Sequence, residues 1–164
     1  MRRRDFARQL KLIKLVVLDF DGVFTDNRVL VFQDGTEGVW CSRGDGMGID
    51  LLRKAGIPAI VISTEKNSVV SARCRKLKLS CIQGCDDKLS VLRREAKRIG
   101  VPLKAVAYMG NDVNDKLCLR AVGFPVCVRD AHPDVARLAK YVTHNRGGYG
   151  AVRELCDMLL EAKR

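Results

Sequence analysis

The sequence has few of the features that mark a membrane, secreted or zinc protein. No apolar run approaches the ~20 residues that a membrane-spanning helix needs. Asp5, Arg8 and Lys11 interrupt the stretch where a secretion signal would need an apolar segment. Only two histidines are present, and the seven cysteines are spread singly, so we expect no structural zinc. The expected location is the cytoplasm, with no membrane contact.

Aromatic residues are also scarce, at 5%, although the net charge is +11. A basic protein can bind nucleic acid, but such surfaces usually carry aromatic residues or a recognition motif, and neither is present. The Lys and Arg residues are instead dispersed along the chain. A basic surface that attracts an anionic small molecule explains the charge equally well, so we expect no nucleic-acid partner.

The order of apolar patterns predicts one α/β domain. The chain has 164 residues, which is enough for a single domain with a substantial core. Short apolar runs alternate with helical patterns, and this alternation is typical of a mainly parallel sheet flanked by helices. Strands are expected at 15–18, 59–62, 81–82, 106–109, 124–128 and 141–143, helices near 44–55, 68–77, 87–99, 114–121, 133–139 and after 150, and a hairpin at 28–41 with strands 29–32 and 39–41.

Two aspartates follow the first expected strand, and the rest of the site is predicted around them. Asp19 and Asp21 lie two residues apart, so in an extended segment their side chains point to the same side. Gly22 allows the backbone to turn sharply and to approach a bound group. Two carboxylates this close repel each other unless a cation intervenes, and Mg2+ prefers such oxygen ligands. A plain Asp-rich turn is the alternative for this short motif alone.

Polar residues also follow two other expected strands, Ser63 and Thr64 after one, Asn111 and Asp112 after the other. Because parallel strands end at the same sheet edge, these residues are expected to meet the aspartate pair. Lys88, at the start of a later helix, is expected to join them. Taken singly, Lys88 is typical of a solvated helix, Ser63 of a helix cap and Asn111 of a turn. Four such polar groups occur in this order: the aspartate pair, Ser63 with Thr64, Lys88, and Asn111 with Asp112. Together they favour one common site over separate structural roles.

The residue types fit phosphoryl transfer. Asp19 is a candidate nucleophile that would form an aspartyl-phosphate, and Asp21 a candidate general acid and base. Ser63 and Lys88 would bind the phosphoryl oxygens, with Thr64 and Gly22 beside them. The predicted Mg2+ ligands are side chains of Asp19 and Asp112 and the backbone carbonyl of Asp21. Asn111 and Asp115 would support them, although Asp115 also suits a helix cap.

The ordered motifs resemble the haloacid dehalogenase superfamily of phosphatases, and the resemblance covers nearly the whole chain. It implies a Rossmann-like domain over residues 1–164 and Mg2+ as cofactor. The segments between Asp21, Ser63 and Lys88 are too short for a separate cap domain, so the resemblance is to the capless subgroup. The motifs are D-F-D-G-V at 19–23, V-I-S-T at 61–64, Lys88, G-N-D-x-x-D at 110–115, S-R-G-D-G-M-G-I at 42–49 and R-G-G-Y-G-A-V-R-E at 146–154.

This subgroup acts on phosphates of 2-keto-3-deoxy sugar acids, which are anionic. Enzymes for the eight-carbon acid KDO usually have T-G-R after the second strand, whereas this chain has Ser63, Thr64 and Glu65. It therefore resembles more closely the phosphatases of nonulosonate (KDN or sialic acid) 9-phosphates, in which residues matching Glu65, Arg73 and Lys76 face the sugar acid. A KDO 8-phosphate phosphatase is the alternative, and a non-catalytic regulatory or oligomerisation module linked to sugar-nucleotide synthesis is a third.

The resemblance also implies an oligomer. Capless members are typically homotetramers that use neighbouring subunits as a lid, with the hairpin at the interface. Here the hairpin carries Val29, Val31, Phe32 and Trp40, and an apolar hairpin on a small domain needs a partner surface. We therefore expect a homotetramer with active sites at the subunit boundaries.

Overall fold

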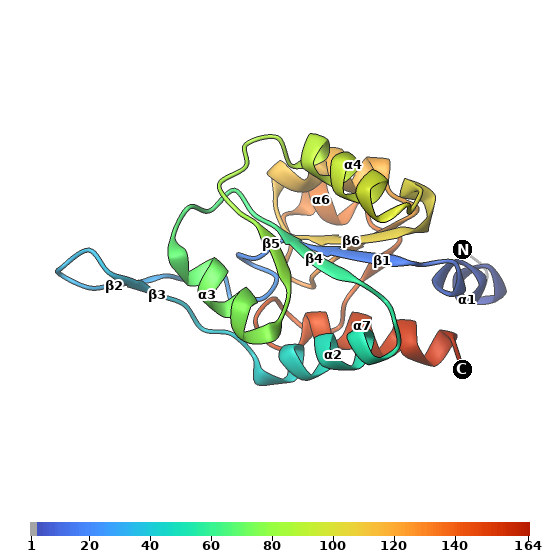
Figure 1. Ribbon diagram of the computed structural model, residues 1–164, viewed down its shortest axis with the longest axis horizontal. Coiled ribbons are helices and arrows are strands. Elements are labelled where there is room, and N and C mark those ends of the chain that lie inside the picture. The colour runs from blue at the N-terminus through green and yellow to red at the C-terminus, as the bar shows by residue number, and fades with distance from the viewer. Residues whose placement is uncertain (1–2) are drawn as a thin grey trace.

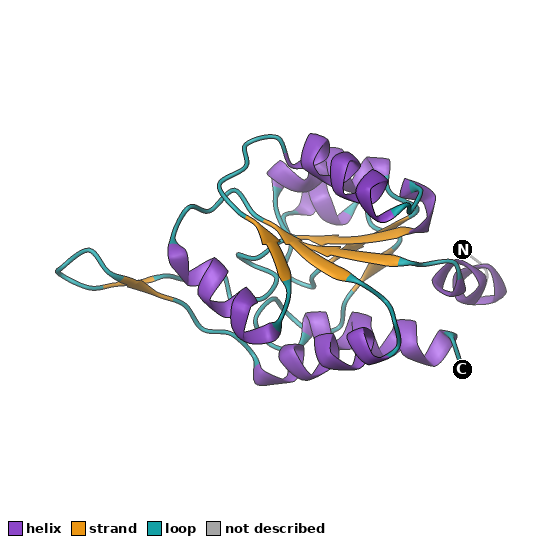
Figure 2. Ribbon diagram, in the orientation of Figure 1, coloured by secondary structure: helices purple, strands orange, loops and turns teal. Residues whose placement is uncertain are grey.

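The computed structural model describes residues 3–164, and a parallel six-stranded sheet lies at its centre (Figures 1 and 2). Each neighbouring pair of strands runs in the same direction, which confirms the predicted α/β class. The first strand is buried along its whole length, as its apolar run predicts. In spatial order the strands are β5 (Ser80–Ile82), β4 (Ala59–Ile62), β1 (Leu15–Leu18), β6 (Val106–Gly110), β7 (Phe124–Cys127) and β8 (Tyr141–Val142).

Helices cover both faces of the sheet because successive side chains of each strand point to opposite faces. Val16 and Leu18 belong to one hydrophobic core, and Leu15 and Val17 to the other. The first core is packed against α1 (Arg3–Lys11), α2 (Arg43–Lys54), α3 (Ser68–Leu77) and α7 (Ala151–Ala162). The second is packed against α4 (Lys88–Ile99), α5 (Lys116–Ala121) and α6 (Pro133–Ala136), with short 3-10 turns η1 (Leu103–Ala105) and η2 (Val113–Asp115).

The chain order places the carboxyl end of β1 at a natural ligand-binding position. After β1 the chain builds β4 and β5 on one side, and it then crosses to β6 on the other side. In open α/β sheets, ligands bind outside the carboxyl ends of strands where the direction of winding reverses. The segment that begins at Asp19 therefore emerges at this reversal, between the ends of β4 and β6.

The hairpin projects from the domain at the end opposite the termini (Figure 1). Its strands are β2 (Leu30–Val31) and β3 (Glu37–Gly38), so the predicted second strand at 39–41 is displaced. The turn explains the shift: the N–H of Phe32 donates to the carbonyl of Thr36 at 2.8 Å, which places Glu37 opposite Val31. In the described part of the chain, no helix has both the length and the apolar character needed to cross a membrane.

Candidate active site

Asp19 lies at the end of β1 and is almost completely buried, with 5% of its surface exposed. The N–H of Phe20 donates to its Oδ1 at 2.7 Å, and the Lys88 ammonium lies 2.7 Å from its Oδ2. Burial raises the pKa of Asp19 to about 7, the nearby Asp115 carboxylate adds to the rise, and Lys88 opposes it. Lys88 is therefore the group that favours the carboxylate form a nucleophile needs.

Lys88 is the first residue of α4, whose N-terminus the Asp87 side chain caps, and its ammonium contacts carboxylates at the carboxyl edge of the sheet. Its Nζ lies 2.7 Å from Asp19 and 2.9 Å from Asp115. Burial acts to lower the pKa of Lys88, but the two carboxylates outweigh it and raise the pKa above its usual value. An ammonium has three donors, and two are used here, so one remains for a phosphoryl oxygen.

Asp115 holds this cluster together and is fully buried. Its Oδ1 accepts from the Tyr108 hydroxyl at 2.7 Å as well as from Lys88, and its Oδ2 accepts from the backbone N–H of Asn111 at 2.9 Å. Asp115 and Asp112 also form a capping box at η2, in which Asp112 is the N-cap, whereas the Asp115 side chain makes no cap hydrogen bond at the start of α5. One carboxylate thus fixes the lysine and the loop that carries Asp112.

Asp21 is half-buried and lies in a loop that Thr25 stabilises. The Thr25 hydroxyl donates to Asp21 Oδ1 at 3.4 Å and accepts from the Gly22 N–H at 3.0 Å. Burial raises the pKa of Asp21, the Glu65 carboxylate adds to it, and the Thr25 hydrogen bond opposes it. A raised pKa favours the protonated form that a general acid needs.

Gly22 is required by both its conformation and its surroundings. Its φ is +72°, and a Cβ at this position would lie 2.0 Å from Nδ2 of Asn111. Asn111 is 8% exposed, and its Oδ1 is buried without a hydrogen-bond partner among the described residues. The structure therefore brings the Asp21 loop and the end of β6 into contact, as predicted from the parallel strands.

Asp112 lies two residues after the end of β6 and is the N-cap of η2, where its Oδ1 accepts from the Val113 N–H at 2.6 Å. Among residues 3–164, no three His, Cys, Asp or Glu side chains form a group that could hold a metal ion. The predicted ligand set contains only two such side chains, Asp19 and Asp112, together with the Asp21 carbonyl. The role of Asp112 stays a prediction.

Ser63 follows β4 and is 1% exposed. Its hydroxyl oxygen accepts from the Glu65 N–H at 3.1 Å, which leaves its O–H free to donate. Asn67, and not Ser63, caps α3, so the helix-cap alternative for Ser63 is excluded. Thr64 is half-buried beside it. The geometry is compatible with the predicted phosphate contact of Ser63.

A hollow of about 340 Å³ opens beside Asp21, and Thr64 and Glu65 line it. Arg73 and Lys76 do not. They line a different hollow, on α2, and Arg73 Nη2 donates to the carbonyl of Ser42 at 2.9 Å. An α-helix has about 3.6 residues per turn, so these cations lie roughly one and a half to two and a half turns beyond the start of α3. Within one chain these two cations therefore line a different hollow from Glu65, and their expected contact with the sugar acid stays a prediction.

A family model described as haloacid dehalogenase-like hydrolase matches residues 64–155. The chain belongs to the haloacid dehalogenase-like hydrolases. A 3-deoxy-D-manno-octulosonate (KDO) 8-phosphate phosphatase from Salmonella typhi is 37% identical to this hydrolase over 152 residues, which cover 92% of this chain and 81% of that protein.

Solved structures agree with this assignment. The KDO 8-phosphate phosphatase from Moraxella catarrhalis, in complex with magnesium, phosphate and KDO, matches with a TM-score of 0.95 at 32% identity, covering 99% of this chain and 94% of its own. A HAD family hydrolase from Streptomyces avermitilis matches with a TM-score of 0.88 at 48% identity, covering 90% and 85%. The predicted family, fold and enzyme class, a phosphomonoesterase, are confirmed.

Two residues of the hydrolase's site were missed by the sequence reasoning. Tyr108 reads as one more apolar position of β6, yet its hydroxyl is bound to Asp115. The signal that could have found it is that a fully buried tyrosine needs a partner for its hydroxyl. Thr25 lies beyond the D-x-D-G motif, and nothing in the local sequence indicates its bond to Asp21.

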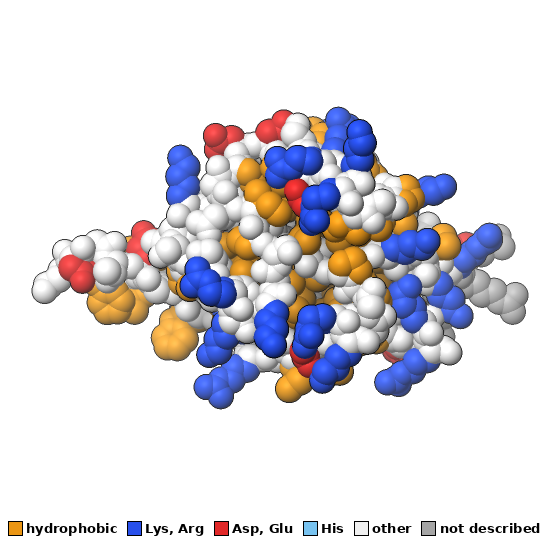
Figure 3. Space-filling view, in the orientation of Figure 1, with side chains coloured by type: hydrophobic (Ala, Val, Ile, Leu, Met, Phe, Trp, Pro, Cys, Tyr) orange, Lys and Arg blue, Asp and Glu red, His pale blue; other side chains and the backbone are white. Residues whose placement is uncertain are grey.

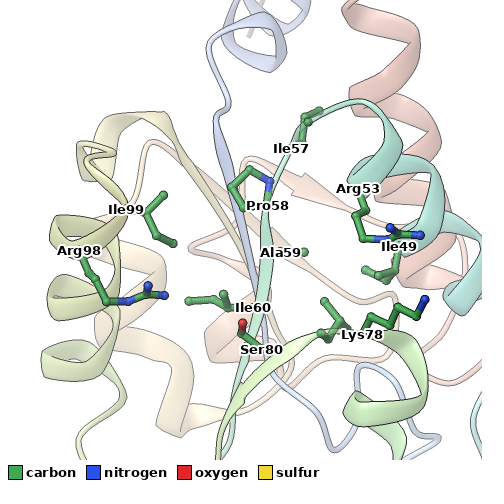
Figure 4. Close-up of a pocket in the computed structure, with 12 residues that line it drawn as sticks. Ile49, Arg53, Ile57, Pro58, Ala59, Ile60, Lys78, Ser80, Arg98 and Ile99 are labelled. Atoms are coloured by element: carbon green, nitrogen blue, oxygen red, sulfur yellow. The ribbon is translucent and has the colours of Figure 1, made fainter.

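The hydrolase has another hollow, of about 420 Å³, among the starts of β4 and β5 and the ends of α2 and α4 (Figure 4). It contains none of the predicted site residues, and three of its lining residues are Arg53, Lys78 and Arg98. Arg53 pairs with Asp50 and Arg98 with Glu95. Three helices end here, and helix C-termini attract cations. The local fold explains these basic residues without a ligand.

Proposed function

We propose that this hydrolase is a single domain that hydrolyses the phosphate ester of a 2-keto-3-deoxy sugar acid. The substrate that it hydrolyses most readily is a nonulosonate (KDN or N-acylneuraminate) 9-phosphate. The contact of Lys88 with Asp19 and Asp115 at the carboxyl ends of β1 and β6 carries this proposal. It supplies a candidate nucleophile and a cation for the phosphoryl group in one buried cluster. Glu65, which lines the hollow beside Asp21, supports the nine-carbon preference.

In the proposed reaction, a carboxylate oxygen of Asp19 attacks phosphorus, and the bond from phosphorus to the sugar oxygen breaks. Asp21 gives its proton to the leaving oxygen. It then takes a proton from water as that water attacks the aspartyl-phosphate, which releases inorganic phosphate and restores Asp19. Lys88 and the Ser63 hydroxyl would stabilise the charge on the phosphoryl oxygens throughout.

The oxygen donors at the site suit Mg2+, the proposed cofactor. Asp19 and Asp112 would hold the ion together with the backbone carbonyl of Asp21, and Mg2+ prefers carboxylate oxygens. The buried Oδ1 of Asn111 has no hydrogen-bond partner among the described side chains, so beside Gly22 this oxygen is free to accept a further contact. When bound, the ion would neutralise negative charge on the transferred phosphoryl group.

The eight-carbon substrate KDO 8-phosphate is the second candidate, because the relatives from Salmonella typhi and Moraxella catarrhalis are named for it. The deciding experiment is kcat/KM with Mg2+ on a nonulosonate 9-phosphate and on KDO 8-phosphate. We expect the nine-carbon value to be higher by at least tenfold. A higher value on KDO 8-phosphate would replace the first candidate by the second. No hydrolysis of either, or of any phosphorylated sugar acid in a panel, would favour a non-catalytic module.

We further propose a homotetramer. Val31 and Phe32 on the hairpin are more than half exposed, and Trp40 beside it is 71% exposed. Figure 3 shows hydrophobic side chains on this projecting segment, whereas the Lys and Arg side chains in this view lie mostly over the body of the domain. Apolar surface on a thin hairpin gains stability when it is buried against another subunit. Light scattering at micromolar concentration should give a tetramer, and a monomeric mass would contradict this proposal.

A further inference from the structure

The hairpin is joined to the rest of the domain by few polar contacts. Both residues of β2 are exposed, and the ribbon of β2 and β3 extends beyond the helices (Figure 1). Within the described chain, a single side-chain hydrogen bond joins residues 30–38 to another part of the fold. It runs from Nδ2 of Asn67 to Oε2 of Glu37, at 2.8 Å, between residues thirty positions apart.

The side chain and the N–H of Asn67 make three hydrogen bonds with different functions. Its Oδ1 accepts from the Val69 N–H at 3.0 Å, which caps α3. Its backbone N–H donates to Oε1 of Glu65 at 2.7 Å, which orients that carboxylate. Its Nδ2 is thereby left to hold Glu37. One residue links the start of α3, the predicted substrate-binding Glu65 and the hairpin.

This bond joins two residues that line the hollow beside Asp21. Glu37 lines it from the hairpin segment, and Asn67 lines it from the segment between Thr64 and the start of α3. Their hydrogen bond therefore ties these two lining segments to each other. The hairpin has no other side-chain tie that could do so among the described residues.

We propose that Glu37 is a positioning residue for substrate specificity. By holding Asn67 it sets the width of the hollow through which the sugar part of a substrate reaches Asp21. The proposal rests on the proposed function, since it assumes a substrate larger than the phosphoryl group. Glu37 acts through Asn67 and the hairpin and is not a group that touches the reacting atoms.

The two residues allow a test in which donor and acceptor are exchanged. Glu37→Ala removes the acceptor. Asn67→Asp keeps the helix cap but replaces the donor by a second carboxylate. Glu37→Gln keeps an acceptor oxygen, and the double variant Glu37→Gln with Asn67→Asp restores a hydrogen bond in the reverse direction. Thr36→Val is the matched control, because the Thr36 hydroxyl bonds to Asp34 inside the hairpin.

The measured quantity is the ratio of kcat/KM for the sugar acid phosphate to kcat/KM for p-nitrophenyl phosphate. We expect this ratio to fall about tenfold in Glu37→Ala and in Asn67→Asp, as the loss of one charge-assisted hydrogen bond allows. It should stay within about twofold of the parent in Glu37→Gln, in Thr36→Val and in the double variant. A merely structural role of this hydrogen bond would lower kcat/KM for both substrates alike and leave their ratio unchanged.

Hydrogen exchange of residues 30–38 in the free protein gives a readout that needs no substrate. Exchange should become faster in Glu37→Ala and Asn67→Asp and return to the parent rate in the double variant. If no sugar acid phosphate is hydrolysed, the proposed function fails while this readout still tests the contact. Unchanged exchange in both single variants would overturn the proposal. A loss of specificity in Glu37→Gln that the double variant does not rescue would also overturn it and make Glu37 a direct substrate contact.

Discussion

Asp45 provides a sharp test of the electrostatics of this fold, because it is a buried carboxylate outside the candidate active site. It lies in the first turn of α2 and is fully buried. Its Oδ1 accepts from the Arg153 N–H at 2.8 Å, but its Oδ2 is buried with no hydrogen-bond partner among the described residues. Burial raises its pKa from 3.8 to about 6, opposed by the Arg153 N–H, Arg73 and the Arg153 charge.

The rise in pKa sets the sign and size of the effect on stability. Below about pH 4 this carboxyl is protonated in the folded and unfolded states, and its burial carries no charge penalty. Between about pH 4 and 6 only the unfolded state loses the proton, so the free energy of unfolding decreases as pH rises. At about 1.4 kcal/mol per pKa unit, the loss amounts to about 3 kcal/mol above pH 6.

Asp45→Asn removes this titration and keeps an oxygen for the Arg153 N–H. Urea unfolding at one fixed protein concentration, from pH 4.5 to 7.5, should show the variant gaining stability relative to the parent as pH rises. Asp50→Asn is the control on the same helix. Lys54 and Arg53 hold the pKa of Asp50 below 3.8, so Asp50 is ionised in the folded and unfolded states throughout this pH range, and the difference between Asp50→Asn and the parent should stay constant with pH. A difference between Asp45→Asn and the parent that stays constant with pH would refute the reasoning.

The remaining predictions concern the site itself. Asp19→Asn should lower kcat by at least about 10³-fold, because an amide is no nucleophile, while circular dichroism shows a folded chain; substantial residual turnover would exclude the aspartyl-phosphate. Tyr108→Phe should lower kcat and reduce stability by about 1 kcal/mol in thermal unfolding, because Asp115 loses a donor; no change in either would remove Tyr108 from the site. Glu65→Ala should reduce the preference for sugar acid phosphates over p-nitrophenyl phosphate, and an equal loss on both would indicate a structural role. Removal of Mg2+ with EDTA should abolish turnover and leave the fold intact; undiminished activity would refute the proposed cofactor.

Local patterns in the sequence predicted most of the sheet and the positions of the acidic residues. The apolar run of β1 ends at Asp19, and parallel pairing with β4 and β6 brings Ser63 and Asn111 to the same edge. Such predictions succeed because burial and strand alternation are properties of short segments. The register of the hairpin was missed, since it depends on which residues the Asp34 turn brings opposite each other.

Contacts between distant segments could not be predicted from the sequence alone. The bond between Tyr108 and Asp115 depends on how a loop folds back onto β6, and the bond between Glu37 and Asn67 depends on where the hairpin leaves the domain. Arg73 was expected, from the family resemblance, to face the sugar acid together with Glu65. Spacing gives the angle around a helix but not the direction of the helix axis, and α3 carries Arg73 toward α2.

The net positive charge of the whole chain is not enough to bind a phosphate at this site, because the site itself is rich in carboxylates. Asp19 and Asp115 both contact a single ammonium, that of Lys88, so this cluster has an excess of carboxylate even though the whole chain carries +11. A phosphate monoester brings further negative charge into this low-dielectric edge, where like charges repel strongly. Binding therefore requires added positive charge, which a divalent cation on the carboxylate oxygens would supply. The dispersed Lys and Arg residues can attract the anion to the surface, but they cannot neutralise it next to Asp19.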